Sequence, residues 1–210
     1  MGGRGGYSGF GGGSGGKSLF STIGKKGKPM SIGRAIKVVN PRYAWEWDER
    51  YSPIGYDENC QRCVLATELQ ARGYDVEALP APVGKTERLQ TSRGASLYFS
   101  DSKYINKLGK RASTVEKNIV SQMKKWGDGS RAFMSVSWKG MNGGHYVNLE
   151  YKQYGDTGVV LVYDGQNGTT STLGEILSKT DAKFTGIIRS DNLKKPNPEW
   201  IKKAVKRRTK

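Results

Sequence analysis

Residues 143–166 read GGHYVNLEYKQYGDTGVVLVYDGQ, and this stretch decides what kind of fold the rest of the chain must build. Two runs rich in β-branched and aromatic residues, His145–Gln153 and Val159–Tyr163, flank a short polar turn, which predicts an antiparallel hairpin. Side chains alternate between the two faces of a strand. A hairpin that sets the start of the first strand against the end of the second therefore places His145 directly opposite Asp164.

His145 is the only histidine among the 210 residues, so its neighbours decide whether it has a chemical role. A carboxylate opposite the ring can accept one ring N–H and leave the other nitrogen as a base. The alternative is that Asp164 ends its strand in a turn and bonds only its local backbone. The sequence leaves both interpretations open.

A second candidate is the stretch Asn59-Cys60-Gln61-Arg62-Cys63, which opens a predicted helix over Cys60–Arg72 with Asn59 as its N-cap. Cys60 falls in the first turn, where the partial positive charge of the helix favours a thiolate. A nucleophilic thiolate needs a partner that takes and returns protons, and His145 is the one histidine available. Cys63, one turn later, is expected to be a small buried residue, but it remains a competing nucleophile.

Several other kinds of site are disfavoured. A CxxC motif at a helix start also describes a dithiol redox site, but that site follows a core strand, and here a loop-like segment precedes the helix. Two cysteines and one histidine fall short of a four-ligand zinc site, so neither a metal nor a cofactor is expected. The glycine-rich start lacks the flanking strand and helix of a nucleotide-binding loop. The Gly-x-Ser-x-Gly match at Gly12–Gly16 lies inside this glycine-rich start, without the strand and helix that form a nucleophile elbow, which disfavours a serine hydrolase.

The remaining pattern indicates an α+β protein with a mainly antiparallel sheet. A capping box at Ser113–Glu116 predicts a second helix, with one apolar stripe along it. The other expected elements are strands over Tyr74–Leu79, Arg131–Trp138 and Phe184–Arg189, and a brief helix over Thr172–Ser178.

The net charge of +16 lies almost entirely at the two ends of the chain. Residues 1–40 hold seven basic side chains and no acidic ones, and residues 194–210 hold eight basic side chains against one acidic. The sequence therefore predicts a glycine-rich, basic, disordered arm over 1–40, a folded domain over 41–193 and a basic tail over 194–210. No membrane span or Sec-type signal is apparent, which predicts cytoplasmic synthesis.

Four motifs in the same order carry a family resemblance. They are NCQRCVLATELQARGYDVEALP from residue 59, QMKKWGDGSRAFMSVSW from residue 122, GGHYVNLEY from residue 143 and VYDGQNG from residue 162. Together they resemble the papain-fold toxin family of bacterial polymorphic toxins and phage-associated proteins. The resemblance extends from about Tyr56 to Leu193 and implies a papain-like fold with glutamine-deamidase or related amide-hydrolysing activity.

Carried over by motif, the resemblance implies a Cys60, His145 and Asp164 triad, with Cys63 as the alternative nucleophile. Gln166 would orient the site, and either Asn59 or Gln166 would add a donor to the oxyanion hole beside the backbone N–H of Cys60. The implied substrate is a protein, attacked at a glutamine side chain or, in a thiol protease, at a peptide bond. A toxin would have an immunity protein and would be delivered into a target cell or associated with a phage particle.

Two interpretations from other classes stay open. The first is a degenerate papain-like module whose basic ends bind nucleic acid or a capsid. The second is the CxxC redox protein.

Overall fold

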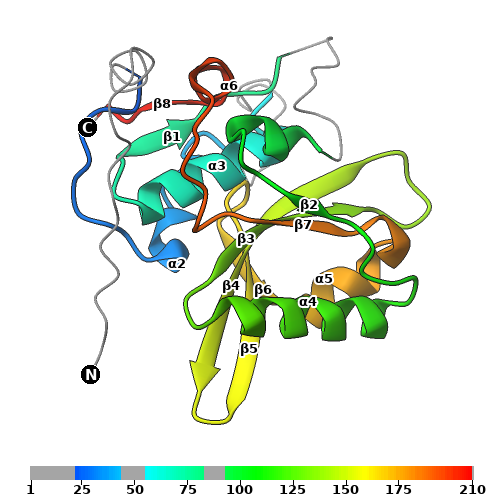
Figure 1. Cartoon of the computed structure of the whole chain (residues 1–210). Coiled ribbons are helices and arrows are strands. Elements are labelled where there is room, and N and C mark those ends of the chain that lie inside the picture. The colour runs from blue at the N-terminus through cyan, green and yellow to red at the C-terminus, as the bar shows by residue number, and fades with distance from the viewer. Residues whose placement is uncertain (1–21, 44–54, 83–92, 210) are drawn as a thin grey trace.

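The computed structural model describes residues 22–43, 55–82 and 93–209, and Figure 1 shows their arrangement. The first half of the described chain contains α2 (Ile32–Ala35), α3 (Cys60–Ala71), β1 (Val76–Ala78), the 3-10 helix η2 (Gly94–Tyr98), β2 (Tyr104–Ile105) and α4 (Ala112–Trp126). The second half contains β3 (Arg131–Ser137), β4 (Gly144–Tyr154), β5 (Thr157–Asp164), β6 (Thr169–Thr172), α5 (Leu173–Lys179), η3 (Ala182–Phe184), β7 (Gly186–Arg189), α6 (Pro198–Ala204) and β8 (Val205–Arg207).

A six-stranded antiparallel sheet in the order β2-β7-β3-β4-β5-β6 forms the centre of the fold. Helix α3 covers one face, where Phe133, Tyr146 and Ile188 belong to the same apolar cluster as the helix. Helices α4 and α5 cover the other face, where alternate residues of the same strands, such as Met134 and Val147, join a second cluster. The predicted α+β class is confirmed, and the alternation along β3 and β4 explains how one sheet supports two cores.

Helix α3 is the most deeply buried helix in the described chain. Ten of its twelve residues are buried, so this helix is surrounded by protein on nearly all sides rather than packed along one stripe. It ends at Ala71, one residue before the predicted end, and Gly73 after the C-cap Arg72 has a φ of +98°. A Cβ at Gly73 would lie 2.5 Å from the carbonyl oxygen of Gly27, in the segment before α2. Only glycine at position 73 therefore leaves room for that segment.

The prediction of a capping box at Ser113 is wrong. Helix α4 begins at Ala112, with Arg111 as an N-cap that makes no side-chain cap hydrogen bond. The capping box forms instead at α5, where the Thr172 hydroxyl accepts from the Glu175 backbone N–H and the Glu175 carboxylate accepts from the Thr172 N–H. The apolar stripe determines which face of α4 packs against the sheet. The residue at which the helix begins depends instead on the conformation of the preceding loop.

The described parts of both basic ends fold onto the domain, which differs from the prediction of an arm and a tail. Ile23 and Val39 are buried in the cluster around α3, and α2 packs on α3. At the other end, Ile201 of α6 is fully buried and β8 pairs antiparallel with β1. The few apolar residues in each basic segment are therefore core residues, and the boundaries predicted at 40 and 194 do not divide the folded body. The glycine-rich residues 1–21 lie outside the described residues.

The observed strand boundaries agree best with the predicted ones in the longer strands, where apolar and polar residues alternate over many positions. Strands β3, β4, β5 and β7 fall within a few residues of the predicted ranges. The predicted strand over Tyr74–Leu79 is present as the shorter β1, which pairs with β8 in a separate two-stranded sheet. The short strands β2, β6 and β8 carry too few residues for a period-two pattern to reveal them.

A buried ionic cluster around Glu68 joins α3 to the central sheet. The Glu68 side chain has no exposed surface; it accepts from Arg72 Nε at 2.7 Å and from Arg131 Nε and Nη2, both at 2.9 Å. The Ser190 hydroxyl donates a further bond at 3.0 Å. Burial alone would raise the pKa of Glu68, but the two guanidinium groups outweigh it and lower the pKa from 4.5 to about 2.

We predict that Glu68→Gln lowers the free energy of unfolding strongly, because two largely buried guanidinium groups lose their counter-charge. Breaking a buried ion pair typically costs about 3–5 kcal/mol. Urea unfolding followed by tryptophan fluorescence measures the change. Glu199→Gln, which removes an exposed pair with Lys203, is the control and should change stability by only about 0.5 kcal/mol. Equal effects of the two substitutions would contradict the assignment.

The same cluster predicts acid sensitivity. Because the folded pKa of Glu68 lies below its ordinary value, the stabilisation is complete above about pH 4.5 and is lost as the pH falls towards about 2. Stability measured across this window should fall more steeply for the wild type than for Glu68→Gln. Parallel curves would show that Glu68 does not contribute to acid unfolding.

Candidate active site

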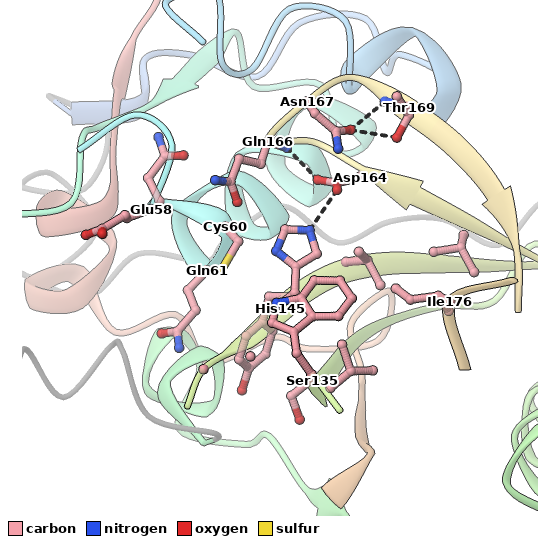
Figure 2. Close-up of a pocket in the computed structure, with 18 of the residues that line it drawn as sticks. Glu58, Cys60, Gln61, Ser135, His145, Asp164, Gln166, Asn167, Thr169 and Ile176 are labelled. Atoms are coloured by element: carbon pink, nitrogen blue, oxygen red, sulfur yellow. Dashed lines mark hydrogen bonds and ion pairs between the residues drawn. The ribbon is translucent and has the colours of Figure 1, made fainter. Parts of the chain in front are cut away.

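Three elements meet at the candidate site: the start of α3, which carries Cys60, the start of β4, which carries His145, and the end of β5, which carries Asp164. Figure 2 shows the imidazole between the other two side chains, with Asp164 on one side of the ring and the Cys60 sulfur on the other. His145 Nε2 lies 2.7 Å from Asp164 Oδ2. The structure therefore brings these three predicted residues together.

The hairpin register differs from the predicted one by two residues. Asn148 pairs with Tyr163 and Leu149 with Val162, so His145 and Asp164 are diagonal neighbours rather than directly opposed. A shift of two residues keeps every side chain on its face, whereas a shift of one would have moved it to the other face. The contact survives the wrong register because the predicted face was right.

Both interpretations of Asp164 hold at once in the structure. Its Oδ2 meets His145, and its Oδ1 accepts the backbone N–H of Gln166 at 2.9 Å. The second bond is the local turn contact that strand-ending aspartates make. It fixes the rotation of the carboxylate, so the oxygen that faces His145 is held in place.

The electrostatics of His145 depend on both neighbours. Burial of the ring disfavours its charged form, but hydrogen bonds to Asp164 and Cys60 and the charges of both groups outweigh burial. Together they raise the pKa of His145 from 6.5 to about 10. The imidazole is therefore protonated at neutral pH and can donate a proton from either nitrogen.

Cys63 occupies a different environment from Cys60. Its side chain is fully buried in the core cluster around α3, and its Sγ donates to Asn59 Oδ1 at 3.1 Å. Burial, with the nearby Cys60 and Asp164, raises the pKa of the Cys63 thiol well above its ordinary value. Such a thiol is a poor nucleophile and a poor partner for disulfide exchange.

The two other predicted residues support the loops around the site. Asn59 is buried, and its Nδ2 donates to Asn40 Oδ1 and to the Leu79 carbonyl, both at 3.1 Å. Gln166 Nε2 donates to the Asp57 carbonyl, and the backbone N–H of Gln166 orients Asp164. Both amides are thus bonded to protein groups, and the Gln166 backbone N–H supports the orienting role expected for that residue.

Sequence reasoning missed Asn40, which it assigned to the N-terminal arm. The Asn40 side chain is only 8% exposed, and its Nδ2 lies within hydrogen-bond distance of the Tyr56 carbonyl, Asn59 Oδ1 and the Gln166 carbonyl, at 3.0, 3.3 and 2.8 Å. One amide therefore links the loop before Cys60 to the loop after Asp164. A lone asparagine in a basic segment carries no sequence signal for such a role.

Two further residues determine the surroundings of His145. The Trp138 indole stacks on the imidazole with ring centroids 5.7 Å apart and planes inclined by 22°. A Cβ at Gly144 would lie 2.3 Å from the Val136 carbonyl oxygen, so only glycine allows β4 to approach β3 this closely just before His145. The Gly-His pair thus has a steric reason beyond the motif that contains it.

The three side chains line a cavity of about 1020 Å³ at the surface. Its walls come from the loop before α3, the ends of β3 to β6 and α5. Among the described residues, no group of three histidine, cysteine or acidic side chains could hold a metal ion, and no helix is long and apolar enough to span a membrane.

Comparison with known proteins gives one match. Residues 58–169, over half of the chain, match the family model described as papain fold toxin 1, glutamine deamidase. The chain belongs to this family. Its α+β fold is accordingly papain-like, with α3 as the helix that carries the cysteine and the antiparallel sheet packed against it. No curated protein and no solved structure matches the chain.

The matched region contains Cys60, His145, Asp164 and Gln166, and the predicted papain-fold toxin family is confirmed. Asn40 lies outside it. The N-terminal segment of this chain therefore contributes a buried polar contact to the papain-like domain from beyond the matched region.

We predict that Asp164→Asn lowers the pKa of His145 from about 10 towards its ordinary value of 6.5, because the amide removes the negative charge beside Nε2. The single histidine gives one set of imidazole NMR signals, so its titration can be followed without assignment ambiguity. Glu58→Gln, an exposed carboxylate on the cavity wall, is the control and should leave the pKa unchanged. An unaltered titration in Asp164→Asn would show that the carboxylate does not hold the ring charged.

We also predict that Asn40→Ala lowers the free energy of unfolding by about 1–3 kcal/mol, because several buried groups lose a hydrogen-bond partner. Thermal unfolding measures the loss. The imidazole signals of His145 should shift as well, since the loop that orients Asp164 loses its anchor. A variant that is destabilised with unchanged His145 signals would limit Asn40 to a structural role.

Proposed function

We propose that this protein is a cysteine-dependent deamidase of glutamine side chains in target proteins. The observation that carries the proposal is the position of the single imidazole, which lies between the Cys60 sulfur and the Asp164 carboxylate and is hydrogen-bonded to the latter at 2.7 Å. In this proposal Cys60 is the nucleophile, His145 transfers protons and Asp164 orients His145. The family description, which names a glutamine deamidase, supports the choice of substrate.

In the first half-reaction, the Cys60 sulfur attacks the carboxamide carbon of the target glutamine and forms a tetrahedral intermediate. Collapse of the intermediate breaks the carbon–nitrogen bond. The protonated His145 donates to the departing nitrogen, so ammonia leaves and a thioester remains on Cys60. The raised pKa of His145 supports this step because the proton is already on the ring at neutral pH.

In the second half-reaction, His145 must act as a base. Once Cys60 is a thioester, its contribution to the raised pKa of His145 is lost. The neutral imidazole can then take a proton from water as the water attacks the thioester. The products are a glutamate side chain and the free thiol, and Asp164 keeps the ring oriented throughout.

The backbone N–H of Cys60 is the donor that the geometry offers to the developing oxyanion. It lies in the first turn of α3, where helix geometry leaves N–H groups without an intrahelical acceptor. The side chains of Asn59 and Gln166 bond protein carbonyl oxygens instead. We therefore assign them to positioning of the loops around the oxyanion site.

A toxin role extends the proposal to partners and location. We propose that an immunity protein protects the producing cell by binding the domain, and that the protein reaches its target by delivery into a cell or with a phage particle. The same triad would also cleave a peptide bond, since only the leaving group differs. A product with an unbroken chain and glutamate in place of glutamine separates the deamidase from a thiol protease.

We predict that iodoacetamide labels Cys60 preferentially in the native protein at neutral pH, because Cys63 is buried and its pKa is raised. In His145→Ala the rate of Cys60 labelling should fall by about 10²-fold. Peptide mass spectrometry identifies the labelled residue. Cys63→Ala is the matched control and should keep the wild-type rate.

The same variants test the reaction itself. With casein as the probe, the wild type and Cys63→Ala should release ammonia and Cys60→Ala should not. Labelling of Cys60 that does not depend on His145 would contradict the triad. Cleaved casein without ammonia release would replace the deamidase with a protease.

A further inference from the structure

The cavity over Cys60 and His145 is larger than a glutamine side chain requires. Its volume of about 1020 Å³ lies at the upper end of the range that encloses a drug-sized ligand. The glutamine amide has to reach only the Cys60 sulfur, so the rest of the cavity is available to the residues on either side of that glutamine. What those residues are can be inferred from the two ends of the cavity.

One end is apolar. Met141 and Phe184 are 68% and 55% exposed, and with Trp138 they line a second hollow of about 530 Å³. The second hollow shares four lining residues with the first, so the two are continuous. We call Trp138, Met141 and Phe184 the apolar rim.

The apolar rim lies directly beside His145. Trp138 stacks on His145, and the β3–β4 loop that carries Met141 ends at Gly143, two residues before His145. Exposed apolar side chains scattered singly need no explanation, but two beside an active-site tryptophan form a surface suited to an apolar group. Lys183 Nζ pairs with Asp181 at 3.1 Å and lies 4.7 Å from the centroid of the Phe184 ring, and Lys139 Nζ donates to the Ser178 carbonyl. Both cations beside the rim therefore have partners in the protein.

The other end of the cavity carries two exposed carboxylates, with the mostly buried Arg62 one turn further along the chain. Asp57 and Glu58 are exposed and line the cavity in the loop before α3. Figure 2 shows Glu58 and Ile176 of α5 on opposite sides of the Cys60–His145 pair. The apolar rim lies on the α5 side, because Trp138 bridges Thr180 directly after α5. A chain that crosses the cavity with its glutamine at Cys60 would therefore have the apolar rim at one flank and these two carboxylates at the other.

We propose that the substrate segment carries an apolar residue on one side of the target glutamine and a basic residue on the other. The apolar side chain is buried on the rim, and the basic side chain faces Asp57 and Glu58. The inference rests on the proposed deamidase function and adds the sequence class of its target. Free glutamine offers neither flank, so it is disfavoured as the substrate.

The test uses blocked peptides that each contain one glutamine. The first pair has leucine on one side and arginine on the other, in both orders. A second pair has serine in place of leucine, and a third pair has glutamate in place of arginine, each again in both orders. Binding to the Cys60→Ala protein is measured by calorimetry, and ammonia release is measured with the wild type, so recognition and chemistry are read separately.

One order of the leucine–arginine peptide should bind best. Replacing leucine by serine should weaken binding about tenfold. Replacing arginine by glutamate should weaken it about threefold to tenfold, and less in high salt. In the Cys60→Ala background, the double variant Met141→Ser with Phe184→Ser should lose the preference for leucine, and Glu58→Lys should reverse the preference for arginine. Tyr154→Ser is the control, because Tyr154 is equally exposed but lies at the far end of the β4–β5 hairpin.

The two proposals fail in different ways. Equal binding of all peptides, no measurable binding, or a leucine preference that survives the double variant would overturn the inference. Ammonia released equally from every peptide would also overturn it and leave the deamidase intact. Selective binding without ammonia release from the wild type would keep the recognition surface and contradict the deamidase.

Discussion

The buried carboxylate of Glu68 constrains the position of the helix on which the whole site depends. A charge without exposed surface is tolerable only when its partners are fixed, and these come from α3 itself and from Arg131 at the start of β3. Strand β3 pairs with β4 along its full length. The angle at which α3 lies on the sheet is therefore tied to the strand that carries His145, and Cys60 at the helix start takes its place relative to that strand.

The positions of the three site residues were largely predictable, because the spacing of apolar residues along a strand or helix shows which face of that element each side chain occupies. Alternation along the two strands placed His145 and Asp164 on one face, and the helix pattern placed Cys60 in a first turn. The register was not predictable, because the turn at residues 154–157 could close at more than one position. A shift of two residues between the strands leaves every side chain on the same face of the sheet. The contact between His145 and Asp164 therefore forms even though the predicted register was wrong.

Long-range packing was the part that the sequence could not reveal. Ile23 is an isolated apolar residue in a basic segment, and only its place in the core cluster around α3 distinguishes it from an exposed residue. The same holds for Asn40, whose partners lie up to 126 residues away. The capping box at Ser113 failed for a related reason, because the incoming loop, rather than the local motif, sets the first turn of α4.

The pairing of β1 with β8 has a consequence for the order of events during synthesis. Strand β1 follows directly after α3, but its partner is the last strand of the fold, and Arg62, two residues from Cys60, bonds the Lys203 carbonyl. The surroundings of the helix cannot be completed until residues 203–207 have left the ribosome. A nascent chain therefore carries Cys60 on an incompletely packed helix, and the packing around that helix is completed only after the last strand has been translated.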